Sequence, residues 1–226
     1  MWREEIMKNQ FWPVVGKALA AMTVTLIMAL ILTPGAWAAN TYKILDQFNG
    51  TDGADPIEAQ FVFDAAGNLY GTTEAGGVYG YGTVFELTPN SDGSWTETVL
   101  YSFTGGTDGQ GPFAGVIFDT IGNLYGTTTS GGEYGDGTVF TLTPNSGGGW
   151  TETVIYNFTG GNDGYEVVGG VTFDGAGNLY GTATQGGASG NGDVYELSPT
   201  RTGAGPRARS TVSKAAETEP IRITPV

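Results

Sequence analysis

The chain contains neither cysteine nor histidine among its 226 residues. The lack of cysteine excludes disulfides and thiolate metal sites. The lack of histidine excludes Ser-His-Asp and Cys-His triads, imidazole general bases and nearly all catalytic zinc sites. Together these two absences remove most of the common nucleophilic and metal-dependent enzyme classes.

Basic residues are also scarce, with nine in all, and none lies between residues 44 and 200. The same stretch holds 19 of the 23 acidic residues. Binding to a phosphate backbone needs cationic side chains, so this region is not expected to bind nucleic acid or an anionic membrane surface. Cations, neutral glycans and basic protein patches remain as partner classes.

Glycine is abundant, at 39 residues, while aromatic residues still make up 12%. Enough apolar surface is therefore present to build a core, which argues against a disordered glycine-rich polymer. Glycine combined with β-branched and aromatic residues is typical of short strands joined by tight turns.

An internal repeat organises the chain. The heptad Gly-Asn-Leu-Tyr-Gly-Thr-Thr at 67–73 recurs at 122–128 and, with a final alanine, at 177–183, a spacing of 55 residues. The same period relates Phe48, Phe103 and Phe158, and also Pro89, Pro144 and Pro199. We therefore divide the chain into three repeats, 42–89, 95–144 and 150–199.

Each repeat is expected to contain four short strands, which in the second lie at 96–103, 115–119, 124–128 and 138–143. Tandem four-stranded antiparallel units predict an all-β, β-propeller-like fold, and a β-solenoid is the alternative. Propellers typically have at least four blades, so three predict an open arc. Its exposed inter-blade faces and edges predict self-association.

The two ends differ from the repeats. Arg3, Lys8 and Lys17, an apolar run at 18–32 and the small residues of Ala36-Trp37-Ala38 predict a signal peptide helix over 1–38, with an uncleaved anchor as the alternative. The chain is thus expected to be exported. Residues 200–226 lack the repeat and are expected to be a disordered tail. When the codons of residues 202–207 are read in a shifted frame, their possible translations include Asp-Gly-Ser-Trp-Thr-Glu, the sequence of residues 92–97. We therefore interpret the tail as an out-of-frame remnant of a fourth repeat. The nucleotide sequence of the gene would decide this.

The run Leu-Tyr-Ser-Phe-Thr-Gly-Gly-Thr-Asp-Gly at 100–109, the heptad at 122–128 and Gly-Thr-Val-Phe at 137–140 resemble the GloVer (Gloeobacter/Verrucomicrobia-type) tandem repeat over roughly residues 42 to 199. This repeat is found in exported choice-of-anchor surface proteins. The resemblance implies export and surface display, and it implies no particular activity. The chain departs from the pattern in having few repeats and no recognisable anchor.

Two sets of recurring carboxylates have a structural and a functional interpretation. Asp64, Asp119 and Asp174 precede the turn of each heptad and are expected to cap it through hydrogen bonds to turn N–H groups, rather than to form a carboxylate ring. The Asp-Gly loops are expected to be turns, with calcium binding as the alternative. They comprise Asp52-Gly53-Ala54-Asp55, Asp108-Gly109 and Asn162-Asp163-Gly164.

Chemistry on a repeat fold is expected where the repetition breaks. The acids without a counterpart are Glu58, Glu74, Glu133, Asp136 and Glu166. Two of them could hydrolyse a glycoside if they converged. Trp95 and Trp150 begin strands and are expected to pack between blades. Tyr79, Tyr81 and Tyr134, in glycine-rich loops, are the better candidates for contact with a ligand.

The sequence therefore predicts a non-enzymatic exported repeat protein that presents a surface for binding or adhesion, to a glycan or a surface protein. It assigns no catalytic, cofactor or metal residue. A carboxylate-based glycan hydrolase and a calcium-stabilised structural array are the alternatives.

Overall fold

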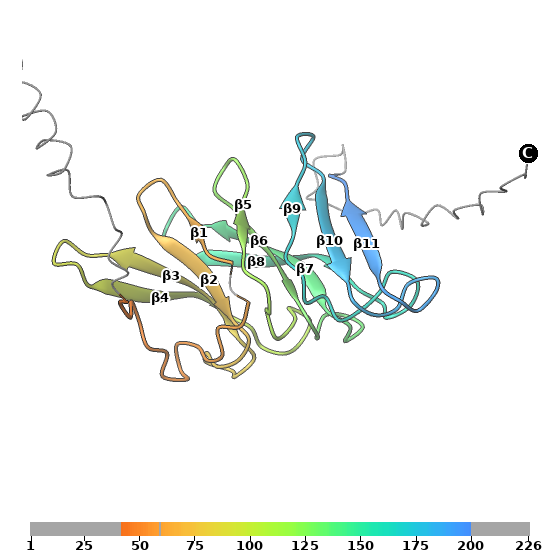
Figure 1. Ribbon diagram of the computed structural model, residues 1–226, viewed down its shortest axis with the longest axis horizontal. Helices are drawn as coiled ribbons and strands as arrows, with labels where there is room; N and C mark the ends of the chain where they lie inside the picture. The colour runs from red at the N-terminus through yellow and green to blue at the C-terminus, as the bar shows by residue number, and fades with distance from the viewer. Residues whose placement is uncertain (1–41, 59, 200–226) are drawn as a thin grey trace, which may run out of the picture. The chain divides into compact units, whose positions relative to one another are not determined.

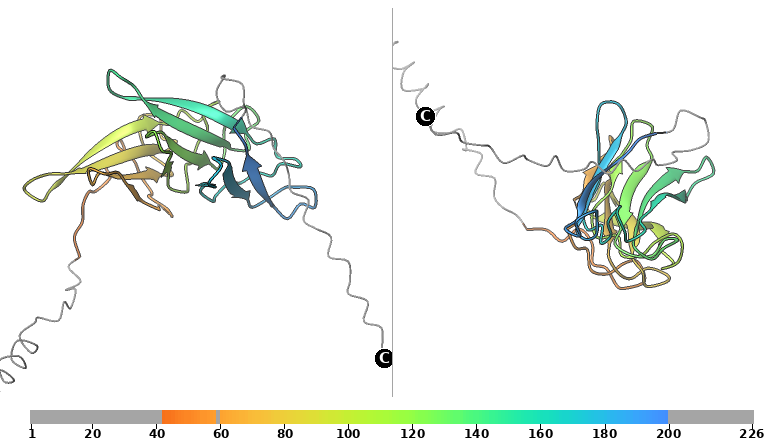
Figure 2. Two further views of the ribbon diagram at one scale, coloured as in Figure 1. Left: turned by 90° about the horizontal axis from the view of Figure 1, so that it is seen from above. Right: turned by 90° about the vertical axis from the view of Figure 1, so that its right-hand side faces the viewer.

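The structure is a computed structural model that describes residues 42–58 and 60–199, and within these ranges the chain is all-β (Figure 1). Eleven strands form three antiparallel sheets, and no helix occurs in the described part. The sheets belong to a compact unit that begins at Ile44 and follow one another in chain order (Figures 1 and 2). This confirms the all-β prediction.

Each sheet is a simple meander of consecutive strands. Sheet 1 contains β1 (Val62–Phe63), β2 (Leu69–Thr73), β3 (Thr83–Pro89) and β4 (Trp95–Ser102). Sheet 2 contains β5 (Ile117–Phe118), β6 (Leu124–Thr128), β7 (Thr138–Pro144) and β8 (Trp150–Asn157). Sheet 3 contains β9 (Thr172–Phe173), β10 (Leu179–Ala183) and β11 (Asp193–Leu197). Antiparallel meanders exclude the β-solenoid alternative.

The recurring heptad forms a turn followed by the second strand of each sheet. Gly67 has a φ of 88°, a left-handed conformation that glycine adopts at little cost, and it closes the turn between β1 and β2. The glycine inside the strand has a different role. A Cβ at Gly126 would lie 2.6 Å from the ring of Phe140 on β7, so the absent side chain makes room for a buried aromatic ring.

The sheets are out of phase with the repeats by one strand, which corrects the predicted grouping. β4, which begins the repeat 95–144, pairs with β3 of the preceding repeat, for example Thr88 with Thr96. The reason is local. The tight turn 90–94 is closed by a hydrogen bond from Asn90 N to Ser94 O (2.8 Å) and folds β4 back on β3, whereas the longer segment 103–116 leads to the next sheet.

Within the described residues, sheet 3 consequently has three strands, whereas four were predicted for each unit. The residues equivalent to β4 and β8 lie past residue 199, outside the described ranges. At the other end, residues 42–48 are one period before the end of β4 but are not assigned to a strand. The signal peptide prediction for 1–38 and the predicted tail at 200–226 also fall outside the described residues.

The core lies between neighbouring sheets. Phe103 packs edge-on against Phe140, with ring centroids 5.1 Å apart, and Phe158 packs in the same way against Tyr195. Thr72 Oγ1 donates a 3.0 Å hydrogen bond to Ala114 O, and Thr127 Oγ1 repeats this bond to Gly169 O. Each sheet thus buries a face on the next, as blades do. The arrangement is an open, propeller-like array, as predicted.

Candidate functional site

The aspartates before the heptads are turn caps, as predicted. Asp64 Oδ1 accepts hydrogen bonds from the backbone N–H groups of Ala66 (2.8 Å) and Asn68 (2.9 Å). Its Oδ2 accepts from the side chains of Asn68 and Tyr70. Burial favours the neutral acid, but these hydrogen bonds outweigh it and hold the pKa of Asp64 below its usual range. Asp119 and Asp174 make the same network.

The carboxylates of the Asp-Gly loops are also used by turns. Asp108 Oδ2 accepts from Thr104 N (2.8 Å) and from the Tyr101 hydroxyl (3.0 Å), while its Oδ1 accepts from Thr104 Oγ1. Asp163 repeats this pattern, and Asp52 accepts from Asn49. This bears out the turn interpretation. Within 42–58 and 60–199, no three metal-ligating side chains are grouped around a common point, and the calcium alternative stays a prediction.

The two tryptophans pack into cores. Trp95 is partly buried against the cluster of Leu69, Phe85 and Leu87 in sheet 1. Trp150 packs against the cluster that joins sheets 1 and 2. The prediction of packing between blades is therefore confirmed for Trp150, whereas Trp95 packs within sheet 1.

A hollow of about 360 Å³ between the loops of the first two repeats brings together three residues that the sequence singled out. These are Asp55, Glu74 and Tyr81. The rest of the lining is contributed by Ala75, Gly80, Gln110, Gly111, Thr129 and Ser130. The lining thus offers two carboxylates, a side-chain amide, two aliphatic hydroxyl groups and one phenol ring.

Backbone hydrogen bonds fix the shape of this hollow. Asp55 O accepts from Glu74 N (3.0 Å), which places the two acidic residues on neighbouring segments. Gly111 N donates to Tyr81 O (3.0 Å), and Gly111 O accepts from Thr129 N (3.0 Å). These hydrogen bonds therefore hold the segments that line the hollow in place without a ligand.

The left-handed backbone at Asp55 recurs in every repeat. Asp55 has a φ of 55°, and the structurally equivalent Gly111 and Glu166 have φ values of 63° and 52°. A side chain at such a φ is strained, and the second repeat avoids this strain with glycine. The backbone shape is thus constant, while the side chain presented from it changes between repeats.

Tyr81 gives the hollow its aromatic wall. Its ring covers Gly105, where a Cβ would lie 2.6 Å from the ring. One repeat later, Asp136 lies against Gly160 in the same way. Tyr81 remains 44% exposed, so one side of the ring is open to solvent. The hollow between the first two repeats therefore brings the aromatic candidate Tyr81 together with Asp55 and Glu74.

The other candidate residues are not gathered there. Tyr79 and Tyr134 are more than half exposed at loop tips, and Glu133 and Glu166 are also exposed. Glu58 lines a separate hollow of about 300 Å³, formed with segments 114–117 and 168–171. In the described part of the chain, the acids without a counterpart do not form a single carboxylate cleft.

Sequence reasoning missed Glu97 and Glu152. Burial, followed by the charges of Asp52 and Asp46, raises the pKa of Glu97 to about 7. Burial and the charge of Asp108 raise the pKa of Glu152 to about 7 as well. The structure gives Oε1 of either residue no hydrogen-bond partner. The signal available was the alternation Trp-Thr-Glu-Thr-Val, which puts the glutamate on the same side of the strand as the apolar residues.

In the described part, no helix has the length and apolarity of a membrane span. No curated protein matches the chain. A family model for the Gloeobacter/Verrucomicrobia repeat matches residues 32–216, which is most of the sequence and includes all three sheets. With its 55-residue period, its heptads and its repeated sheets, the chain belongs to the Gloeobacter/Verrucomicrobia repeat family.

Proposed function

We propose that the chain is an exported, non-enzymatic repeat protein that binds a neutral glycan in the hollow lined by Asp55, Glu74, Tyr81 and Gln110. The observation that carries this proposal is the meeting of these four side chains at one place where the repeats differ. The recurring Asp64, by contrast, is occupied by its own turn. The hollow thus combines polar groups with a ring that is open to solvent.

The chemistry of the lining favours sugar hydroxyls. Carboxylate and amide oxygens accept hydrogen bonds from hydroxyl groups, and the amide N–H group and the serine hydroxyl donate to them. The Thr129 hydroxyl donates to Gly111 O and keeps only its acceptor capacity. An exposed tyrosine ring can cover the apolar face of a sugar. The stretch 44–200 has no basic residue to neutralise phosphate or sulfate, so a neutral ligand fits better than an anionic one.

Export and surface display are part of the proposal. The pattern of residues 1–38 supports cleavage after Ala38, and the family resemblance supports display. N-terminal sequencing of the protein recovered outside the cytoplasm is expected to begin at Ala39. Recovery of the uncleaved chain in the cytoplasm alone would refute export.

Binding is tested with a panel of neutral glycans and the variant Tyr81→Ala. We expect at least one glycan to bind, and Tyr81→Ala to weaken it about 10-fold, the loss of one stacked ring. Tyr134→Ala is the matched control, because Tyr134 is a similarly exposed loop tyrosine that does not line the hollow. No binding by the unmodified protein, or equal loss in both variants, would refute this site.

Hydrolysis is the second candidate, because Asp55 and Glu74 line the same hollow. A glycoside hydrolase needs two such carboxylates on opposite sides of the scissile bond. Release of reducing ends from a bound glycan, lost in Glu74→Gln while binding persists, would establish it. Binding without release is the result expected for the non-enzymatic protein.

A further inference from the structure

Sheet 3 has an edge that is covered in the other two sheets. β3 pairs with β4 and β7 pairs with β8, but in the described part β11 pairs with β10 alone. Val194 on β11 is 59% exposed, whereas its equivalents Val84 and Val139 are fully buried. An unpaired strand carrying an exposed valine is a template for another strand.

The chain carries a segment with the pattern of the missing strand. Residues 44–48, Ile-Leu-Asp-Gln-Phe, are one period before Val-Leu-Tyr-Ser-Phe at 99–103. Phe48 packs against Phe85 of sheet 1 (5.0 Å between ring centroids), as Phe103 packs against Phe140 of sheet 2. The segment therefore sits against sheet 1 in the way that the end of β4 sits against sheet 2, but it is not in a strand.

We infer that two copies of the chain exchange these segments, so that residues 42–48 of each form the fourth strand of sheet 3 in the other. The register follows from sheet 1, where Val84 pairs with Tyr101 and Phe85 pairs with Val99. Shifted by the repeat period, Val194 lies opposite Asp46 of the second copy, and Tyr195 lies opposite Ile44. Addition of a strand to an open sheet edge is a common mode of recognition.

Charge supports this register. In sheet 1, Glu86 pairs with Thr98. Shifted by the repeat period, this pair becomes Glu196 of β11 opposite Lys43 of the second copy, at the junction between the two chains. Lys43 is the only basic residue between positions 18 and 200. Opposite charges directly across an antiparallel pair are favourable, and neither internal junction has such a pair.

The side chain at the end of the donated segment also matches. Ser102 Oγ and Asn157 Oδ1, the final side chains of β4 and β8, accept hydrogen bonds from Val78 N (3.3 Å) and Glu133 N (2.8 Å). Gln47 is the equivalent residue, and its amide oxygen can accept from the N–H group of Ala188 in the second copy. The donated strand thus keeps a polar contact found at both internal junctions.

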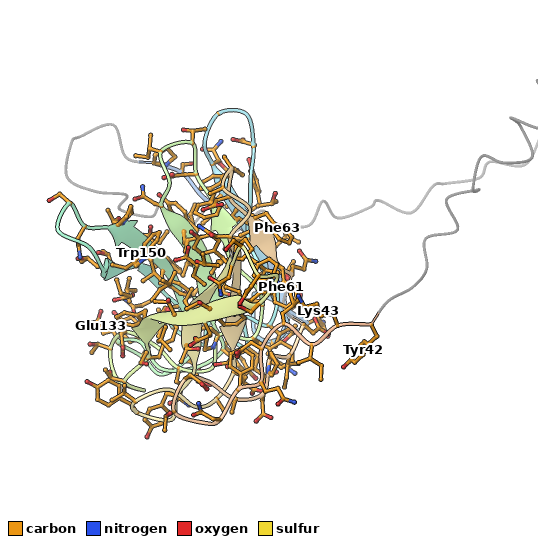
Figure 3. The ribbon with its side chains drawn as sticks, turned by 90° about the vertical axis from the view of Figure 1, so that its left-hand side faces the viewer. Tyr42, Lys43, Phe61, Phe63, Glu133 and Trp150 are labelled. Atoms are coloured by element: carbon orange, nitrogen blue, oxygen red, sulfur yellow. The ribbon has the colours of Figure 1, made fainter. Side chains whose placement is uncertain are left out.

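Aromatic side chains on the first strands of the sheets support the exchange as well. Phe118 packs on Tyr70 of the preceding sheet (4.9 Å), and Phe173 packs on Tyr125 (5.1 Å). Their equivalent in sheet 1, Phe63, is 58% exposed, and Figure 3 shows it at the surface near the half-exposed Phe61. The matching position in sheet 3 is Tyr180. Exchange would place Phe63 of one copy on Tyr180 of the other and continue the series.

Two copies give the number of sheets that a closed ring needs. Closed propellers typically have four to eight blades, and six is the only multiple of three in that range. The three sheets of the described part are too few to close a ring that brings residues 42–48 of the same chain to β11. A ring of two has two identical junctions, as two-fold symmetry requires. This assembly does not depend on glycan binding, since the hollow lies within one chain.

The absence of cysteine makes the register directly testable. In the full chain carrying Asp46→Cys and Val194→Cys, oxidation is expected to give a reducible two-chain band, and light scattering to give twice the monomer mass. The control pairs Asp46→Cys with Val84→Cys, because Val84 is already covered by β4. A monomer mass, a ladder of higher species or equal cross-linking in the control would overturn the exchange, as would a fourth strand supplied by residues past 199.

Charge reversal gives a second measurement that needs no disulfide. Lys43→Glu and Glu196→Lys are each expected to weaken dimerisation about 10-fold at low salt, and the double variant is expected to restore it. Circular dichroism on each variant checks that the sheets are retained. Unchanged dimerisation in both single variants, or no restoration in the double variant, would overturn the register.

Discussion

Phe103 is the side chain whose loss should damage the fold most clearly. It is fully buried between the end of β4 and sheet 2, where it makes edge-on contacts with Tyr101 and Phe140. Truncating a buried phenylalanine to alanine removes its burial free energy and leaves a cavity, at a combined cost of about 3–5 kcal/mol. Phe103→Ala is therefore expected to lower the free energy of unfolding by that amount.

The repeat supplies an internal control. Phe48 occupies the equivalent position on sheet 1 but is only partly buried, so Phe48→Ala should cost clearly less, about 1–2 kcal/mol. Both costs are measured by urea denaturation, with circular dichroism and tyrosine fluorescence as independent probes. To isolate the junction from exchange between copies, the comparison is made at a protein concentration where the chains are monomeric.

The aromatic contact itself is separable. A double-mutant cycle of Phe103→Leu with Phe140→Leu should give a coupling free energy of about 0.5–1.5 kcal/mol, the value of an edge-on aromatic pair beyond its buried area. A cost for Phe103→Ala below about 1 kcal/mol would refute the reasoning. It would mean that neighbouring sheets do not share a close-packed core.

Three further outcomes are expected. Glu152 has a folded pKa of about 7, above its ordinary 4.5, so the native state binds this proton more tightly than the unfolded state does. The free energy of unfolding therefore falls as pH rises from about 4.5 through 7. Glu152→Gln should raise the free energy of unfolding by roughly 1 kcal/mol at pH 8, a figure reduced for solvent screening, and by little at pH 4. A pH-independent effect in urea titrations would contradict this. Glu166→Gly should stabilise the protein by about 1 kcal/mol, because it removes a side chain from a residue with a left-handed backbone conformation. Glu133→Gly is the control, because Glu133 has an ordinary φ, and it should not stabilise the protein. Equal effects of the two substitutions would argue against strain at Glu166. Because Asp108 and Asp163 are held by turn hydrogen bonds, a calcium chelator should leave the Tm unchanged, and a lower Tm would support the calcium-stabilised array.

The sequence predicted the strands well because their signals are local. The heptad marks a turn and a strand within seven residues, and Asp64 reaches no further than Tyr70 to make its cap. The period could not show where one sheet ends and the next begins, since a 55-residue spacing is unchanged when the boundary moves. The tight turn at 90–94 decides that boundary through hydrogen bonds that pair β4 with β3.

The candidate site could be predicted only in part. Asp55 stood out in an Asp-Gly loop, Glu74 as an acid without a counterpart and Tyr81 in a glycine-rich loop. All three belong to the first repeat, where Glu74 N donates to Asp55 O, but the hollow that they line also needs the second repeat. Gln110 and Gly111 reach the hollow from the next repeat, through bonds such as Gly111 N to Tyr81 O. No spacing in the sequence encodes that approach. The shifted pKa of Glu97 was similarly hidden, because it depends on burial and on the carboxylates of Asp46 and Asp52.

The one-strand offset between repeat and sheet also has a genetic consequence. Insertion or loss of one whole 55-residue period, wherever its breakpoints fall, adds or removes one sheet and leaves every remaining sheet with strands from two adjoining repeats. Recombination between repeats therefore does not have to respect a structural boundary. Such a gene can lengthen or shorten by unequal crossing-over while each product keeps the same kind of junction, which makes array length easier to change than sheet architecture.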